Sequence, residues 1–110
     1  MTRIGRFVRM RARAGAGDEL QEPMVRVAAT LEPIVGCELY VVCRSATEPD
    51  TVWVSECWAD QQALEASVGA TPPDGTDAVQ PAEVFALLTG PPEVIAVSPV
   101  AGVGLTASEV

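Results

Sequence analysis

The chain has 110 residues, of which 48% are hydrophobic, and its formal net charge is −8. This length fits one domain with its own core, and the hydrophobic content argues against disorder. No apolar run approaches the roughly 18 residues of a membrane-spanning helix, and the first residues lack the apolar stretch of a secretory signal. We therefore expect a single cytoplasmic domain over residues 1–110 that does not bind a membrane.

Charge is unevenly distributed along the chain. The first 44 residues hold all seven basic residues, each an arginine, and five acids, which gives +2. The remaining 66 residues hold ten acids and no base, which gives −10. Such a chain repels nucleic acid overall, so we expect a small molecule or a protein as partner. The net charge also serves solubility.

The residue types that are missing limit the chemistry. Histidine, asparagine and lysine are absent, which excludes Ser-His-Asp and Cys-His catalysis, histidine-ligated metals and lysine Schiff bases. The three cysteines, Cys37, Cys43 and Cys57, lack CxxC spacing, so neither a disulfide framework nor a zinc site is indicated. We interpret them as core thiols and predict no metal and no cofactor.

Residues 6–13 alternate with a period of two, which predicts a strand. One face of this strand is apolar, and the other carries Arg9, Arg11 and Arg13. These three arginines should therefore lie on a single face of a sheet.

A helix is predicted to follow over about residues 18–33. Apolar residues recur there at helical spacing, and Asp18 is a suitable N-cap. Pro23 would remove a hydrogen bond in the second turn, so the helix either begins near Glu22 or is kinked. Gly36 is expected to end it.

The remaining elements are expected in the order strand, strand, helix, helix, strand. Their ranges are 37–45 and 51–58, paired as an antiparallel hairpin, then 61–67 capped by Asp60, 81–90 beginning at Pro81, and 93–100. Residues 70–77 are rich in Pro, Gly and Asp and predict a loop. A glycine-rich tail follows from residue 101.

The order β-α-β-β-α-(α)-β is that of the ferredoxin-like split βαβ plan. We therefore predict an α+β fold in which a four-stranded antiparallel sheet carries its helices on one face. The uncovered apolar face of so small a domain usually finds a partner. A homodimer with the two sheets face to face would cover it.

Four segments of this chain resemble a known family: "FVRMRARAGAGDEL", "GCELYVVCRS", "EPDTVWVSECWADQQALEAS" and "GPPEVIAVSPVAG". They are similar to the antibiotic biosynthesis monooxygenase domain, of the dimeric α/β-barrel superfamily. The resemblance covers about residues 5–102 and leaves 103–110 as a tail. Its most specific part is the E-x-W-x-D-x-x-A-L string, here Glu56, Trp58, Asp60, Ala63 and Leu64.

The resemblance implies fold more strongly than reaction. Members include cofactor-independent oxygenases that convert aromatic polyketide anthrones or quinols to quinones with molecular oxygen, while others degrade haem or turn over small signalling molecules. Haem degradation in that family uses an asparagine and a histidine, which this chain lacks. The family often has a histidine shortly after the A-L pair, where this chain has Ser67.

The function implied is therefore a homodimeric, cofactor-independent monooxygenase that oxidises an aromatic polyketide-like quinol or anthrone with molecular oxygen. Two alternatives stay open. One is a module that binds a small molecule or a protein without chemistry. The other is a non-oxidative cyclase or isomerase on the same fold.

Three residues are predicted to be catalytic in the oxygenase interpretation. Trp58 offers a flat wall for an aromatic substrate, or else closes the core. Glu56 is the candidate base. Arg9 is the candidate cation for a developing anion, or else it pairs with an acid.

Three further residues are predicted to bind substrate. Tyr40, the only tyrosine, can donate a hydrogen bond to a quinol oxygen or else fill an interface. Ser67 can position a hydroxyl group, and Phe85 adds an aromatic side chain from the third helix. Trp53 has the opposite parity to Trp58 and should lie on the other sheet face, under the partner.

Overall fold

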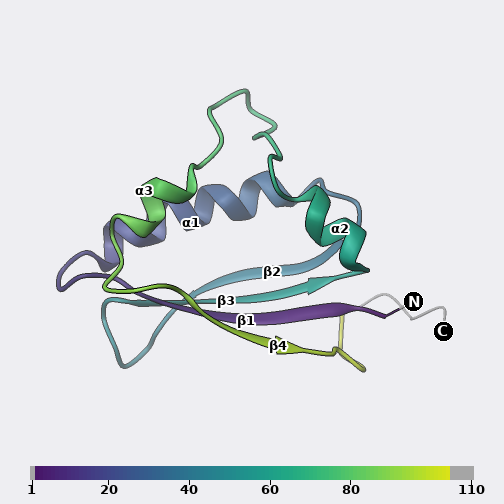
Figure 1. Cartoon of the computed structure of the whole chain (residues 1–110), viewed down its shortest axis with the longest axis horizontal. Helices are drawn as coiled ribbons and strands as arrows, with labels where there is room; N and C mark the ends of the chain where they lie inside the picture. Colours follow the sequence, from purple (N-terminus) through teal and green to yellow (C-terminus); the bar gives the residue numbers. More distant parts are fainter. Residues whose placement is uncertain (1, 105–110) are drawn as a thin grey trace.

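The computed structural model describes residues 2–104, so the predicted tail at 103–110 lies, from residue 105 on, outside the described residues. In chain order the elements are β1 (Ile4–Arg11), α1 (Gly17–Leu31), β2 (Cys37–Arg44), β3 (Thr51–Trp58), α2 (Gln61–Ala66), α3 (Pro81–Phe85) and β4 (Glu93–Val97). The four strands form one antiparallel sheet in the order β2-β3-β1-β4, and the helices lie on one side of it (Figure 1). This arrangement confirms the predicted ferredoxin-like α+β fold.

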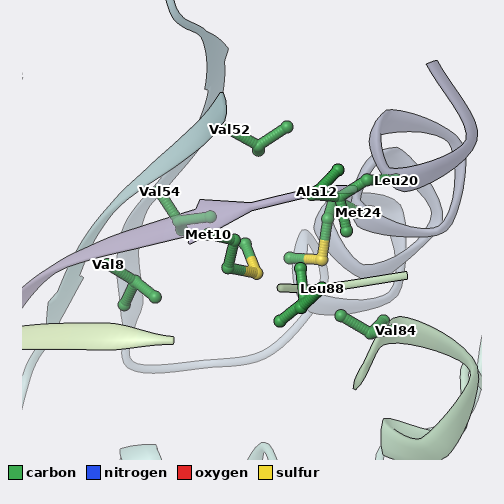
Figure 2. Packing of buried hydrophobic residues seen from close by; sticks show 9 residues of the cluster. All are labelled: Val8, Met10, Ala12, Leu20, Met24, Val52, Val54, Val84 and Leu88. Atoms are coloured by element: carbon green, nitrogen blue, oxygen red, sulfur yellow. The ribbon is translucent and has the colours of Figure 1, made fainter. Parts of the chain in front are cut away.

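The core lies between the sheet and the helices. Val8 on β1 pairs with Val54 on β3, and both side chains are buried on the helix side. Leu20 and Met24, four residues apart on α1, meet this apolar sheet face (Figure 2). None of the helices described within residues 2–104 is long and apolar enough to cross a membrane.

The start of α1 is capped from outside the helix. The Asp50 carboxylate, just before β3, accepts hydrogen bonds from the backbone N–H groups of Gly15 at 2.9 Å and Gly17 at 3.0 Å. These bonds hold the pKa of Asp50 below its ordinary value. Asp18 was the predicted N-cap, which is wrong: it lies inside the first turn and pairs with Arg44 at 2.9 Å.

The helix is shifted toward the N-terminus relative to the prediction. It begins at Gly17 rather than near Glu22, and Pro23 lies buried inside it. It ends at Leu31, earlier than Gly36, because Pro33 has no N–H to continue the helical bonding. Gly36 instead adopts a positive φ of +94° in the turn that leads into β2.

The other sheet face is not covered by the described helices. Trp53 pairs with Arg9 on this face, as its parity predicted. Cys43 also pairs with Trp53 and is exposed, so its assignment to the core was wrong. Cys57 is buried and Cys37 is partly buried. We refer below to this uncovered side as the open face.

Candidate functional site

Glu56 is a carboxylate buried on the helix side of β3, with 4% of its side chain exposed. Its Oε1 atom accepts hydrogen bonds from Arg6 Nη2 at 2.8 Å, Arg6 Nε at 3.2 Å and Trp58 Nε1 at 2.9 Å. These charge-assisted bonds offset the cost of burying the carboxylate. Within residues 2–104, every donor that reaches Glu56 binds Oε1, which leaves Oε2 for another partner.

Trp58 orients this carboxylate from the core. It follows Glu56 by two residues on β3, so both side chains point to the same sheet face. Its neighbours across the sheet are Ile4 and Cys37, and only 1% of its surface is exposed. The indole therefore fills the core and donates to Glu56, and the flat wall predicted for an aromatic substrate is closed in this structure.

Tyr40 lies on β2 directly opposite Glu56. Burial and the charge of Glu56 raise its pKa well above the ordinary value, so the phenol stays neutral. Its hydroxyl forms no hydrogen bond with any residue that the structure describes. The described part of the chain thus leaves the Tyr40 hydroxyl available to a ligand as a hydrogen-bond donor.

A surface cavity of about 370 Å³ lies between the carboxyl end of α1 and β2. Its volume is at the small end of ligand pockets, which run from about 300 to 1,000 Å³. Tyr40 connects this cavity to the buried carboxylate, because it lines the cavity and is the neighbour of Glu56 on the adjacent strand. The lining residues are Ala28, Ala29, Leu31, Glu32, Cys37, Glu38, Leu39 and Tyr40.

The raised pKa of Tyr40 has a direct optical test, since phenolate absorbance in this chain reports Tyr40 alone. We expect the folded protein to show little phenolate at about pH 11, where a free tyrosine is mostly ionised. The unfolded chain releases this proton first, so stability should fall as the pH rises above about 10, by up to about 1.4 kcal/mol per pH unit. Glu56→Gln should move the ionisation to lower pH. A midpoint near 10 in the folded wild type would contradict the burial of this phenol.

The other predicted site residues lie away from the cavity. Arg9 is on the open face, with its guanidinium carbon 5.5 Å from the centre of the Trp53 ring and an ion pair to Glu93. Ser67 follows α2 and donates to the Leu64 carbonyl at 2.6 Å. The structure does not bring these residues to Glu56.

Phe85 lines a second, smaller cavity. It is the last residue of α3, is 57% exposed, and shares a space of about 200 Å³ with Leu88, Pro91 and Pro92 among others. No residue of this second cavity lines the one beside Tyr40. Trp58, Glu56 and Tyr40 are therefore the predicted residues that the fold gathers at one place.

Arg6 is the residue of this site that the sequence reasoning missed. It pairs with Glu56 across β1 and β3 and faces the helix side, like Val8 two residues later. Its parity was the available signal, because an arginine on the apolar face of a strand needs a buried acid. Within residues 2–104, no group of three or more Cys, Asp and Glu side chains is arranged to hold a metal ion.

The fold and this site define an α+β protein of ferredoxin-like type with a cavity beside a buried carboxylate. Residues 3–72, more than half of the chain, match the family model for antibiotic biosynthesis monooxygenase. The chain therefore belongs to the antibiotic biosynthesis monooxygenase family.

Solved structures support this assignment. A candidate antibiotic biosynthesis monooxygenase from Chloroflexus aurantiacus J-10-fl is 30% identical, with a TM-score of 0.75 over 96% of this chain and 100% of that one. Two other structures, both less than 25% identical, show the fold alone. A candidate antibiotic biosynthesis monooxygenase from Caulobacter crescentus CB15 is 23% identical, with a TM-score of 0.75 over 91% of this chain and 92% of that one. A protein of unknown function from Nitrosomonas europaea is 22% identical, with a TM-score of 0.75 over 98% of both chains. Among curated proteins, none shows significant sequence similarity.

Proposed function

We propose that this protein is a cofactor-independent monooxygenase that oxidises a small aromatic anthrone or quinol with molecular oxygen. The observation that carries the proposal is the Glu56 carboxylate, whose donors within the described residues all bind Oε1 and which lies across the sheet from Tyr40, a lining residue of a cavity of ligand size. Family membership supports the same reaction class.

The proposed reaction needs a base, a hydrogen-bond donor and an electron-rich substrate. Glu56 does not line the cavity itself, so it accepts the proton of the substrate through one bridging water, and Tyr40 donates a hydrogen bond to the oxygen that gains negative charge. The substrate anion then reduces oxygen. For an anthrone, the methylene carbon loses two hydrogens and gains one oxygen atom, while the second oxygen atom leaves in water. A quinol would instead pass two electrons and two protons to oxygen, which gives the quinone and hydrogen peroxide, and the protein would act as an oxidase toward that substrate.

Trp58 and Arg6 act in this proposal by positioning Glu56. Both bind Oε1, so Oε2 keeps a fixed direction. The predicted roles of Arg9, Ser67 and Phe85 remain predictions, and the proposed reaction uses none of them.

Oxygen consumption by metal-stripped protein, with a panel of anthrones and reduced naphthoquinones, tests the proposal. We expect Glu56→Gln to lower the catalysed rate, measured above spontaneous oxidation, by about 10²- to 10⁴-fold, which is the usual effect of removing a general base. Tyr40→Phe should lose less, because only a hydrogen bond is removed. Glu65→Gln, an exposed acid on α2, is the matched control and should behave as wild type.

A wild-type rate equal to spontaneous oxidation for every substrate would overturn the oxygenase proposal. One observation favours the alternative of a binding module without chemistry, namely that the Trp58 ring is closed to solvent. In that case the cavity would retain aromatic ligands without turning them over.

We also propose that the chain forms a homodimer through the open face. Apolar side chains stand exposed there on three strands: Phe7 on β1, Val41 on β2 and Ile95 on β4. Such a band costs free energy in water and is typical of an interaction surface. Charged pairs stand at its two ends, Arg9 with Glu93 and Arg3 with Glu38, which suits a self-complementary interface.

The dimer is tested by one substitution on each side of the molecule. Phe7→Asp places a charge in the centre of the band, and sedimentation equilibrium should then show a monomer where the wild type is a dimer. Phe85→Asp, an exposed aromatic side chain on α3, is the control and should leave the dimer intact. A monomeric wild type at micromolar concentration would exclude this interface.

A further inference from the structure

The cavity beside Tyr40 stands at the negative end of a long helix. Its walls include Ala28, Ala29 and Leu31 from the last turn of α1, a helix of 15 residues. The carboxyl end of such a helix carries a partial negative charge of about half an electron. The last turn of α1 holds no basic residue that would offset this charge.

Glu32 adds a full negative charge at the same place. It is the C-cap of α1, is exposed, and lines the cavity. It forms no ion pair with any residue in the described part of the chain. Its charge is therefore screened only by solvent and salt.

The remaining charges near the cavity are balanced. Glu38, the second carboxylate of the lining, binds Arg3 through both of its oxygens at 2.7 and 3.2 Å. Glu56, across from Tyr40, binds Arg6. No arginine lines the cavity itself. The local sum is thus negative and comes from Glu32 and the end of α1.

We infer that this cavity accepts an uncharged or cationic aromatic ligand and rejects an anionic one, so that substrates bearing a carboxylate are excluded. The inference rests on the proposed function for the identity of this cavity as the substrate site. Tyr40 supplies an aromatic surface, and its hydroxyl can donate to the oxygen of a phenol or accept from an aromatic ammonium ion.

Three ligands with one ring system test this selectivity by binding alone. They are 2-naphthol, 2-naphthoate and 2-naphthylmethylammonium, which at neutral pH are uncharged, anionic and cationic. Titration calorimetry at low salt should show the ammonium ion binding roughly tenfold more tightly than the carboxylate, with the phenol between them. The difference should nearly vanish at about 1 M salt, where the Debye length is about 3 Å.

Two matched variants locate the source of the selectivity. Glu32→Gln should reduce the difference between the two charged ligands to about threefold, since the end of α1 still contributes. Glu19→Gln removes an exposed acid from the same helix, 13 residues away or about 20 Å along its axis, and should change nothing. Tyr40→Phe should lower the affinity for 2-naphthol, and this loss would show that the ligand binds in this cavity.

Equal affinities for the three ligands, tightest binding of 2-naphthoate, or an unchanged preference in Glu32→Gln would each overturn the inference. Absence of binding by all three would overturn it as well. Its failure is distinct from failure of the proposed function. Charge-selective binding without oxygen consumption would overturn only the proposed oxygenase function. Oxygen consumption without a charge preference would overturn only the proposed charge selectivity.

Discussion

Trp58→Ala should lower the free energy of unfolding by about 3–5 kcal/mol, the usual cost of removing a large buried aromatic side chain. The indole is 1% exposed and is among the largest fully buried side chains of the described structure. Its loss leaves a cavity and also removes one donor from Glu56. Urea unfolding followed by circular dichroism measures the change.

Two controls separate packing from hydrogen bonding at this position. Trp58→Phe keeps most of the buried volume and removes the bond to Glu56, so we expect it to cost less than the alanine variant, about 1–3 kcal/mol. Trp53→Ala, on the open face, lies against Arg9 and should cost less than Trp58→Ala in the monomer. If both alanine variants were equally destabilised, the burial of Trp58 would contribute no more to stability than the contacts of the less buried Trp53.

The faces of the strands could be predicted from alternation alone. Glu56 and Trp58 share a parity with Val54, and Trp53 has the opposite one, so the grouping of the site on one sheet side follows from the sequence. The same rule put Arg9 on the face opposite Val8, which already separated it from Glu56. Period-two patterns carry this information because each step along a strand reverses the side chain.

Contacts between distant elements could not be predicted in the same way. Asp50 caps α1 from 33 residues away, and only the packed fold brings these groups together. The cavity depends on where α1 ends and on a register irregularity between Cys37 and Leu39 at the start of β2. Local propensity describes neither feature, since both arise from packing between elements.

Ser67 shows why a position matched to a family motif need not keep its role. Its hydroxyl binds the Leu64 carbonyl in the last turn of α2, a common use of serine near a helix end. Nothing in the residue type distinguishes that use from contact with a ligand.

Gly36→Ala should destabilise the fold by about 2–5 kcal/mol for two separate reasons. The residue has a φ of +94°, where an L side chain is strained by about 1–2 kcal/mol. An added Cβ would also lie 2.6 Å from the Cβ of Ala63 on α2, and such overpacking costs about 1–3 kcal/mol. Thermal and urea unfolding measure the total.

Two further variants divide this cost between strain and collision. Gly75→Ala has a similar φ of +81° and no heavy atom within 4 Å, so it should show the strain alone. Ala63→Gly in the Gly36→Ala background removes the colliding atom and should recover the overpacking part, apart from about 1 kcal/mol for glycine within a helix. Gly36 precedes Cys37, which lines the cavity and is the neighbour of Trp58 on the adjacent strand. The close approach of Gly36 to Ala63 therefore places α2 beside the site. A Gly36→Ala variant as stable as Gly75→Ala would mean that α2 moves aside without measurable cost.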